Sequence, residues 1–172
     1  MTLSTALADT PNTEILTNAR LSLWDAIDNY SELATKPYRI VKAYRLSDEQ
    51  AGMRDIVPSV SDLPSLAIIP KTLSPVWYQH KMQKWPYVVD CLLWTKDWAH
   101  SFAENMTVRL LDAFGKSLYS PDLSYVKRAT GYYPLRFGPV SYAPVRLGDA
   151  NGPKVIRTTI QVTLRLAHDP LH

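Results

Sequence analysis

Apolar and polar residues alternate almost without exception over residues 156–167. One set of alternate positions is mainly apolar: Ile156, Thr158, Ile160, Val162, Leu164 and Leu166. The positions between them are polar: Arg157, Thr159, Gln161, Thr163 and Arg165. A period of two is typical of a β-strand that buries one face. We expect a strand that closes a sheet, with one face on helices and the other facing water or another subunit.

Two segments instead repeat apolar residues at helical spacing. In residues 12–33 the stripe contains Ile15, Leu16, Ala19, Leu23, Trp24 and Ile27. In residues 97–118 it contains Trp98, Phe102, Met106, Leu110, Ala113 and Phe114. Both stripes predict amphipathic helices. Asp97 is a suitable N-cap for the second helix, and Gly115 is a residue type that often ends a helix in a left-handed turn.

The remaining regular patterns predict strands. Residues 38–45 and 65–70 form short candidates, and residues 71–96 predict two strands of a hairpin. The part "YVVDCLLW" is apolar on both sides of the pleat, so we expect it in the middle of a sheet, covered on both faces. The predicted fold is α+β, with a mainly antiparallel sheet packed against two amphipathic helices.

The chain of 172 residues predicts a single domain, 1–172, with three extensions. Residues 1–11 are small and polar, and we expect a flexible tail. Residues 46–63 break both periods and carry several acids, which indicates an exposed acidic loop. Residues 119–152 are rich in proline and tyrosine and predict a projecting arm.

The formal net charge of +3 does not require a polyanionic partner, but the charge is unevenly distributed. Residues 1–120 contain 12 Lys and Arg against 13 Asp and Glu, whereas residues 121–172 contain 7 against 3. The single cysteine, Cys91, excludes an internal disulfide and lies in an apolar run typical of a core. No signal peptide or membrane-spanning segment is evident, so we expect a soluble protein of a reducing cytoplasm.

No catalytic motif is present, and we predict neither an enzyme nor a cofactor or metal site. The triplet Gly115 to Ser117 resembles the end of a phosphate-binding loop, but it ends a predicted helix where such a loop must open one. Asp97, His100 and Glu104 share one helical face. Capping and an i,i+4 pair explain this face as well as a metal site does, and no second group of ligands accompanies it.

Aromatic and basic residues are interleaved in residues 125–137 and again in 75–85. Such mixtures bind single-stranded nucleic acids by stacking and charge, and they also mark protein–protein interfaces. We favour a protein interface and keep a nucleic-acid-binding module using residues 125–137 as the alternative. The candidate interface residues are Trp77, Tyr78, Trp85, Tyr132, Tyr133, Arg136, Arg157, Arg165, Asp48, Glu49 and Asp55.

The order of elements resembles that of the tail-terminator, or tail-completion, proteins of tailed bacteriophages and related small neck proteins. The stretches that carry the resemblance are "LTNARLSLWDAI", "YVVDCLLWTKDWAHSFAENMTVRLLDAF" and "VIRTTIQVTLRLA". It covers roughly residues 12–118 and 154–168, whereas the acidic loop and the arm exceed a minimal member of the family.

The resemblance implies a structural virion protein, assembled in the host cytoplasm and located in the tail–neck region. It implies a homo-oligomeric ring, a hexamer, that ends tail-tube growth and contacts the tail tube protein and the head connector. DNA would pass through the lumen without sequence-specific contact, and no membrane is involved. In such a ring, Arg157 and Arg165 would meet acids of a neighbour such as Asp48, Glu49 or Asp55.

Overall fold

The computed structural model describes residues 13–45, 56–74, 76–77, 83–96, 100–118 and 135–168. The helices are α2 (Thr13–Asp28) and α4 (His100–Leu118), with two short 3-10 helices, η1 (Ser31–Leu33) and η2 (Val60–Asp62). The strands are β1 (Lys42–Tyr44), β2 (Ser65–Leu73), β3 (Val76–Trp77), β4 (Gln83–Thr95), β5 (Leu135–Arg146) and β6 (Lys154–His168).

The strands form one sheet in the order β1-β2-β4-β6-β5, and the short β3 pairs with the end of β4. Only the β1–β2 pair is parallel; the other pairs are antiparallel. This arrangement confirms the α+β class with a mainly antiparallel sheet. The alternating segment forms β6, which lies between β4 and β5. It therefore does not close the sheet, as its pattern suggested, and β1 and β5 are the edge strands.

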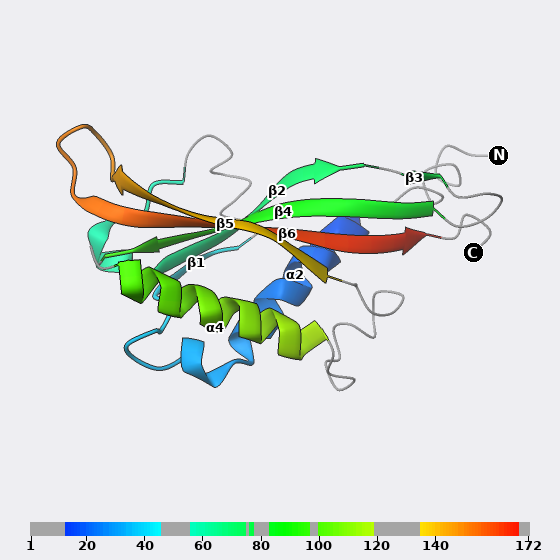
Figure 1. Ribbon diagram of the computed structural model, residues 1–172, viewed down its shortest axis with the longest axis horizontal. Helices are drawn as coiled ribbons and strands as arrows, with labels where there is room; N and C mark the ends of the chain where they lie inside the picture. The colour runs from blue at the N-terminus through cyan, green and yellow to red at the C-terminus, as the bar shows by residue number, and fades with distance from the viewer. Residues whose placement is uncertain are drawn as a thin grey trace.

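Both helices pack on the same face of the sheet, as Figure 1 shows. The predicted stripe of α2 is buried at Ala19, Leu23, Trp24 and Ile27, and that of α4 at Met106, Leu110, Ala113 and Phe114. These side chains form a single core with alternate residues of the strands: Leu66, Ile68, Tyr87, Val89, Cys91, Leu93, Ile160, Val162 and Leu164. The apolar side chains that recur about every four residues in the helices thus pack against those that recur every two residues in the strands, and together they form one apolar layer.

A smaller apolar cluster lies on the opposite face, at one end of the sheet. It contains Leu63, Ala67, Trp94, Leu147 and Val155, and Ile56 packs against it. Part of the segment predicted to be an exposed acidic loop therefore contacts the sheet, while residues 46–55 lie outside the described residues. β4 is central as expected, but the described elements cover both of its faces only near Trp94.

The predicted arm over residues 119–152 differs from the structure in its second half. Residues 135–146 form β5, which pairs with β6 along its length and belongs to the sheet. Residues 119–134 lie outside the described residues, as do residues 1–11, the predicted tail. Regular alternation is weak in β5 because a register shift interrupts it between Phe137 and Val140 and because it contains two prolines.

Glycine is structurally required in the β5–β6 turn, whereas the glycine near the end of α4 does not end that helix. Gly148 has a φ of 85°, a left-handed value that favours glycine. A Cβ atom on Gly152 would lie 1.7 Å from the carbonyl oxygen of Leu147, so this position also requires glycine. Gly115 was expected to end α4, but the helix continues through it to Leu118. The last turn is therefore a regular continuation of the helix.

A chain of polar and aromatic contacts joins the segment after α2 to α4. The Tyr30 hydroxyl donates to Asp112 at 2.5 Å, and this hydrogen bond raises the pKa of Tyr30. The Arg109 guanidinium lies over the Tyr38 ring and 3.4 Å from Glu32. Residues 30–38 are thereby held against the outer side of α4.

Candidate interaction surface

The face of the sheet opposite the helices is the best candidate for a functional surface, because no described helix covers its central part (Figure 1). We call it the open face. Its members are the half-buried or exposed residues that alternate with the core positions of the strands. They include Lys71 of β2; Val88, Asp90 and Leu92 of β4; Arg157, Thr159, Gln161, Thr163 and Arg165 of β6; and Arg136 and Ser141 of β5.

The centre of the open face is mixed in polarity. Strand register places Val88 beside Thr163, Asp90 beside Gln161 and Leu92 beside Thr159. At the neighbouring bulge, a Cβ on Gly138 would lie 3.0 Å from the Cβ of Gln161. The absence of a side chain on Gly138 thus leaves room for the Gln161 side chain beside β5.

Three predicted interface residues share this face. Register pairs Arg136 with Thr163, Arg157 with Trp94 and Arg165 with Pro86, and all three arginines are exposed. Arg157 and Arg165 are separated along β6 by roughly 26 Å, at about 3.3 Å per residue. The three arginines therefore place positive charge at separate points of the same sheet face.

A single carboxylate, that of Asp90, interrupts the positive charge among the described residues of the open face. Its Oδ2 lies 3.7 Å from the Nζ of Lys71. Its Oδ1 is buried at the atomic level and has no hydrogen bond, although the side chain as a whole is 22% exposed. With Lys71 and three arginines against one acid, the described part of the face carries a net charge of +3. An acidic partner surface would complement it.

The other predicted interface residues are not brought to this surface by the described structure. Trp77 and Trp85 belong to β3 and β4, but their side chains are outside the described part. The remaining predicted residues lie outside the described ranges: Tyr78, Tyr132, Tyr133, Asp48, Glu49 and Asp55.

Sequence reasoning missed the two other charged residues named above for the open face, Lys71 and Asp90. Asp90 could have been found, since it is the one charged residue in the apolar run of residues 87–94. Lys71 could not, because it lies at a register shift of β2, between Pro70 and Thr72, where alternation no longer predicts the face.

The edge of β5 is a poorer candidate than the open face for contact with another chain. The Leu147 N–H donates to the Pro153 carbonyl at 3.0 Å, and hydrogen-bonded and non-hydrogen-bonded pairs alternate along an antiparallel ladder. Pro144 and Ile156 therefore form a non-hydrogen-bonded pair, and the Pro144 nitrogen faces away from β6. A proline at an outward position removes a donor that an added strand would need, which is a common protection of edges.

The described residues offer little basis for a reactive thiol or a metal site. The Cys91 thiol is fully buried, and burial followed by the nearby charge of Asp90 raises its pKa, so it is a poor nucleophile. Across the described ranges, no group of three His, Cys, Asp or Glu side chains could hold a metal ion. No described helix is long and apolar enough to cross a membrane.

The sequence matches no protein-family model, and no curated protein is detectably similar to it.

Proposed function

We propose that this protein is a structural virion protein that forms a ring at the head-proximal end of a phage tail, where it ends growth of the tail tube and joins the tail to the head connector. The observation that supports this proposal best is the open face, a sheet surface with Arg136, Arg157 and Arg165 on one side of the molecule. The α+β fold with helices on the other side agrees with the resemblance of the sequence to tail-terminator proteins.

A ring of identical subunits needs two different complementary patches on each subunit, because head-to-tail contacts close only around an axis. In this proposal the open face is one patch, and an acidic surface of the neighbouring subunit or of the adjoining ring is the other. Charge complementarity of this kind fixes register and partner choice more than it adds affinity.

The first test is the mass and shape of the purified protein. Six copies of the 19.5 kDa chain have a mass of about 117 kDa. We expect light scattering on a size-exclusion column to give this mass, with annular particles in negative stain, either alone or after addition of isolated tail tubes. The double variant Arg157→Glu and Arg165→Glu should lose the ring, while Lys36→Glu, an exposed charge reversal away from the open face, should keep it. A protein that stays monomeric and does not bind tail tubes contradicts the proposal.

A nucleic-acid-binding module is the second candidate, favoured by the net positive charge of the open face and by Arg136 at the end of the aromatic and basic segment 125–137. Binding by this surface would weaken steeply with salt, because each phosphate contact releases counterions. Fluorescence anisotropy with a labelled single-stranded oligonucleotide between 50 and 200 mM salt, roughly the range over which such binding falls by orders of magnitude, separates the two candidates. Tight, salt-sensitive binding by a monomer would favour this second function.

A further inference from the structure

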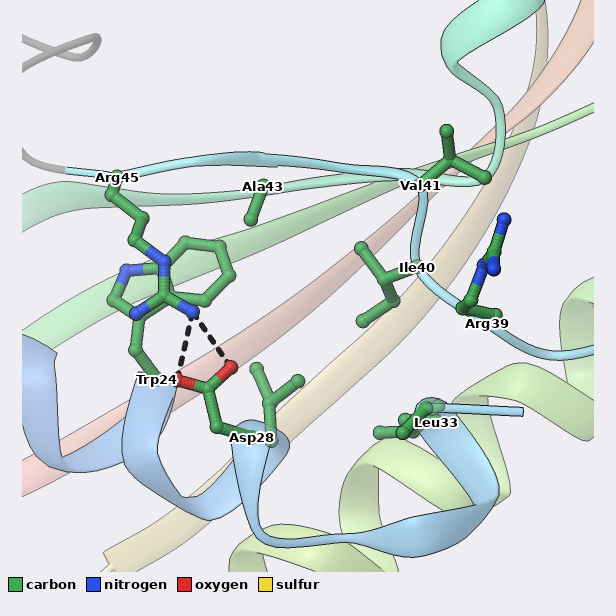
Figure 2. A pocket seen from close by; sticks show the side chains of 10 residues that line it. Trp24, Asp28, Leu33, Arg39, Ile40, Val41, Ala43 and Arg45 are labelled. Carbon is green, nitrogen blue, oxygen red and sulfur yellow. Dashed lines mark hydrogen bonds and ion pairs between the residues drawn. The ribbon is translucent and has the colours of Figure 1, made fainter.

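A pocket with a volume of about 320 Å³ lies on the helix side of the sheet, between the C-terminal part of α2, η1 and the edge strand β1 (Figure 2). Its walls are mainly apolar and include Trp24, Ile27, Leu33, Ile40 and Ala43. This volume is at the small end of known ligand sites. The pocket is separate from the open face, which is on the other side of the sheet.

One end of the pocket is closed by an ion pair. The Arg45 guanidinium donates to both carboxylate oxygens of Asp28 at 2.6 and 2.8 Å, and it lies 5.1 Å from the Trp24 ring centre. Figure 2 shows the two dashed contacts below the Trp24 ring. Asp28 is the one acid in the pocket lining, and Arg45 already neutralises it.

The other cation of the lining, Arg39, has no such partner among the described residues. Its side chain is exposed beside Ile40 and Val41 (Figure 2). Lys36 is exposed nearby in the sequence, and residues 33–45 contain no acid. The accessible charge at this end of the pocket is therefore positive. A ligand with an anionic group next to an apolar group would complement it.

Apolar surface continues beyond the pocket. Val41 lines the pocket and is 45% exposed. Its N–H donates to the Pro64 carbonyl at 2.8 Å, which fixes the backbone at this edge of the pocket. Val41 is among the large apolar side chains most exposed in the described structure. An occupant that fills the pocket and also covers Val41 must be longer than one side chain.

We propose that this pocket binds an extended acidic peptide segment of a partner protein. One aliphatic side chain of the segment enters the space between Ile27, Ile40 and Ala43, and a neighbouring Asp or Glu pairs with Arg39. The rest of the segment covers the exposed Val41. A single apolar anchor with an adjacent charged contact is a common form of peptide recognition, with the anchor giving affinity and the charge giving selectivity. This site goes beyond the proposed ring and does not depend on it.

The test is selection from a randomised eight-residue peptide library with the full-length protein as target. We expect the enriched peptides to combine an aliphatic residue with Asp or Glu within three positions, and to shift the amide signals of residues 39–43 in heteronuclear NMR spectra. The Arg39→Glu variant should bind these peptides at least about tenfold more weakly and should instead enrich peptides that carry Lys. Arg39→Lys should retain the preference for acids.

Two further variants make the result decisive. Ala43→Leu should fill the pocket and abolish enrichment. Because this change could also disturb folding, it is read together with Arg39→Glu, an exposed change that should weaken binding without affecting the fold. Arg157→Glu, a matched charge reversal on the open face, should leave peptide binding unchanged even where it disrupts a ring. Selection of peptides whose binding ignores both Arg39 and Ala43 overturns the proposal, as does failure to select any peptide. Binding of 4-methylpentanoate as tight as that of the best peptide would assign the pocket to a small carboxylate instead.

Discussion

The guanidinium carbon of Arg109 lies 3.7 Å from the centre of the Tyr38 ring, and the same ring stacks on Phe102 at 5.4 Å. Through these contacts α4 holds the chain that leads into β1. Because a cation over an aromatic face and the packed arginine stem both contribute, Arg109→Ala should lower the free energy of unfolding by about 1–2 kcal/mol. Urea denaturation followed by circular dichroism measures this. Arg109→Lys should recover only part of the loss, since an ammonium group does not stack.

The core of α4 should be far more sensitive than its outer face. Leu110 is fully buried, and Leu110→Ala should cost about 2–5 kcal/mol through lost burial and a cavity. Val108, two residues earlier, is 62% exposed, and Val108→Ala should change stability by less than about 0.5 kcal/mol. Equal effects of the two changes in urea denaturation would mean that α4 presents a different face to the sheet.

Two glycines should respond to alanine with opposite signs. At Gly152 a Cβ would collide with the Leu147 carbonyl oxygen, so Gly152→Ala should destabilise the protein by about 2 kcal/mol or more. Gly115 lies within α4 with no atom within 4 Å of a Cβ, so Gly115→Ala should stabilise it by about 0.5–1 kcal/mol. Melting temperatures of the two variants test both signs at once. Destabilisation by Gly115→Ala would show that α4 ends earlier.

The thiol of Cys91 should be protected in the folded protein. It is fully buried between core residues, and burial raises its pKa, so little reactive thiolate is accessible. In buffer, Ellman's reagent should modify the thiol only as fast as the protein unfolds. In roughly 6 M guanidinium chloride, which unfolds most domains, the reaction should be immediate. Rapid labelling without denaturant would contradict the burial of this part of β4.

Asp25 should make stability depend on pH. Burial, and then the negative charge of Asp28, raise the pKa of Asp25 above its ordinary value of 3.8, despite the opposing effect of Arg45. A raised pKa in the folded state means that this group favours folding at low pH and that the contribution is lost as pH rises through the folded-state pKa. Asp25→Asn should therefore be more stable than the wild type at pH 7, and the difference should vanish below pH 3.8. Denaturant titrations across this range measure it, with the exposed Glu104→Gln as the control.

The elements with strong periods could be predicted from the sequence, and the topology could not. The stripes of α2 and α4 and the alternation of β6 each face the core as their spacing indicates, because burial of one face is a local property of the pattern. The position of β6 inside the sheet depends on β5, whose bulge and prolines weaken its own pattern. The turn at Gly148 and Gly152 is likewise determined by backbone geometry that composition alone does not specify.

The candidate surface was predictable only in part, for a related reason. Arg157 and Arg165 share a face because they are an even number of residues apart in one strand. That Arg136 joins them, and that Asp90 lies among these cations, depends on pairing between strands distant in sequence. Pockets such as the one beside Arg39 form where three elements pack together. The periodic pattern of apolar residues within one element does not predict how it packs against the others.

The internal position of β6 has a consequence for how the chain reaches its native state. β5 and β6 are joined by a short turn and can form a hairpin locally, whereas β4 and β6 are separated by α4 and by residues 119–134. Long-range pairing of this kind is slow, because the entropy of closing the loop is lost before the contacts form. Until the hairpin docks, the whole inner edge of β4 is an open template for another chain. Newly made protein should therefore pass through an aggregation-prone stage, and chaperones that shield strand edges should raise its yield.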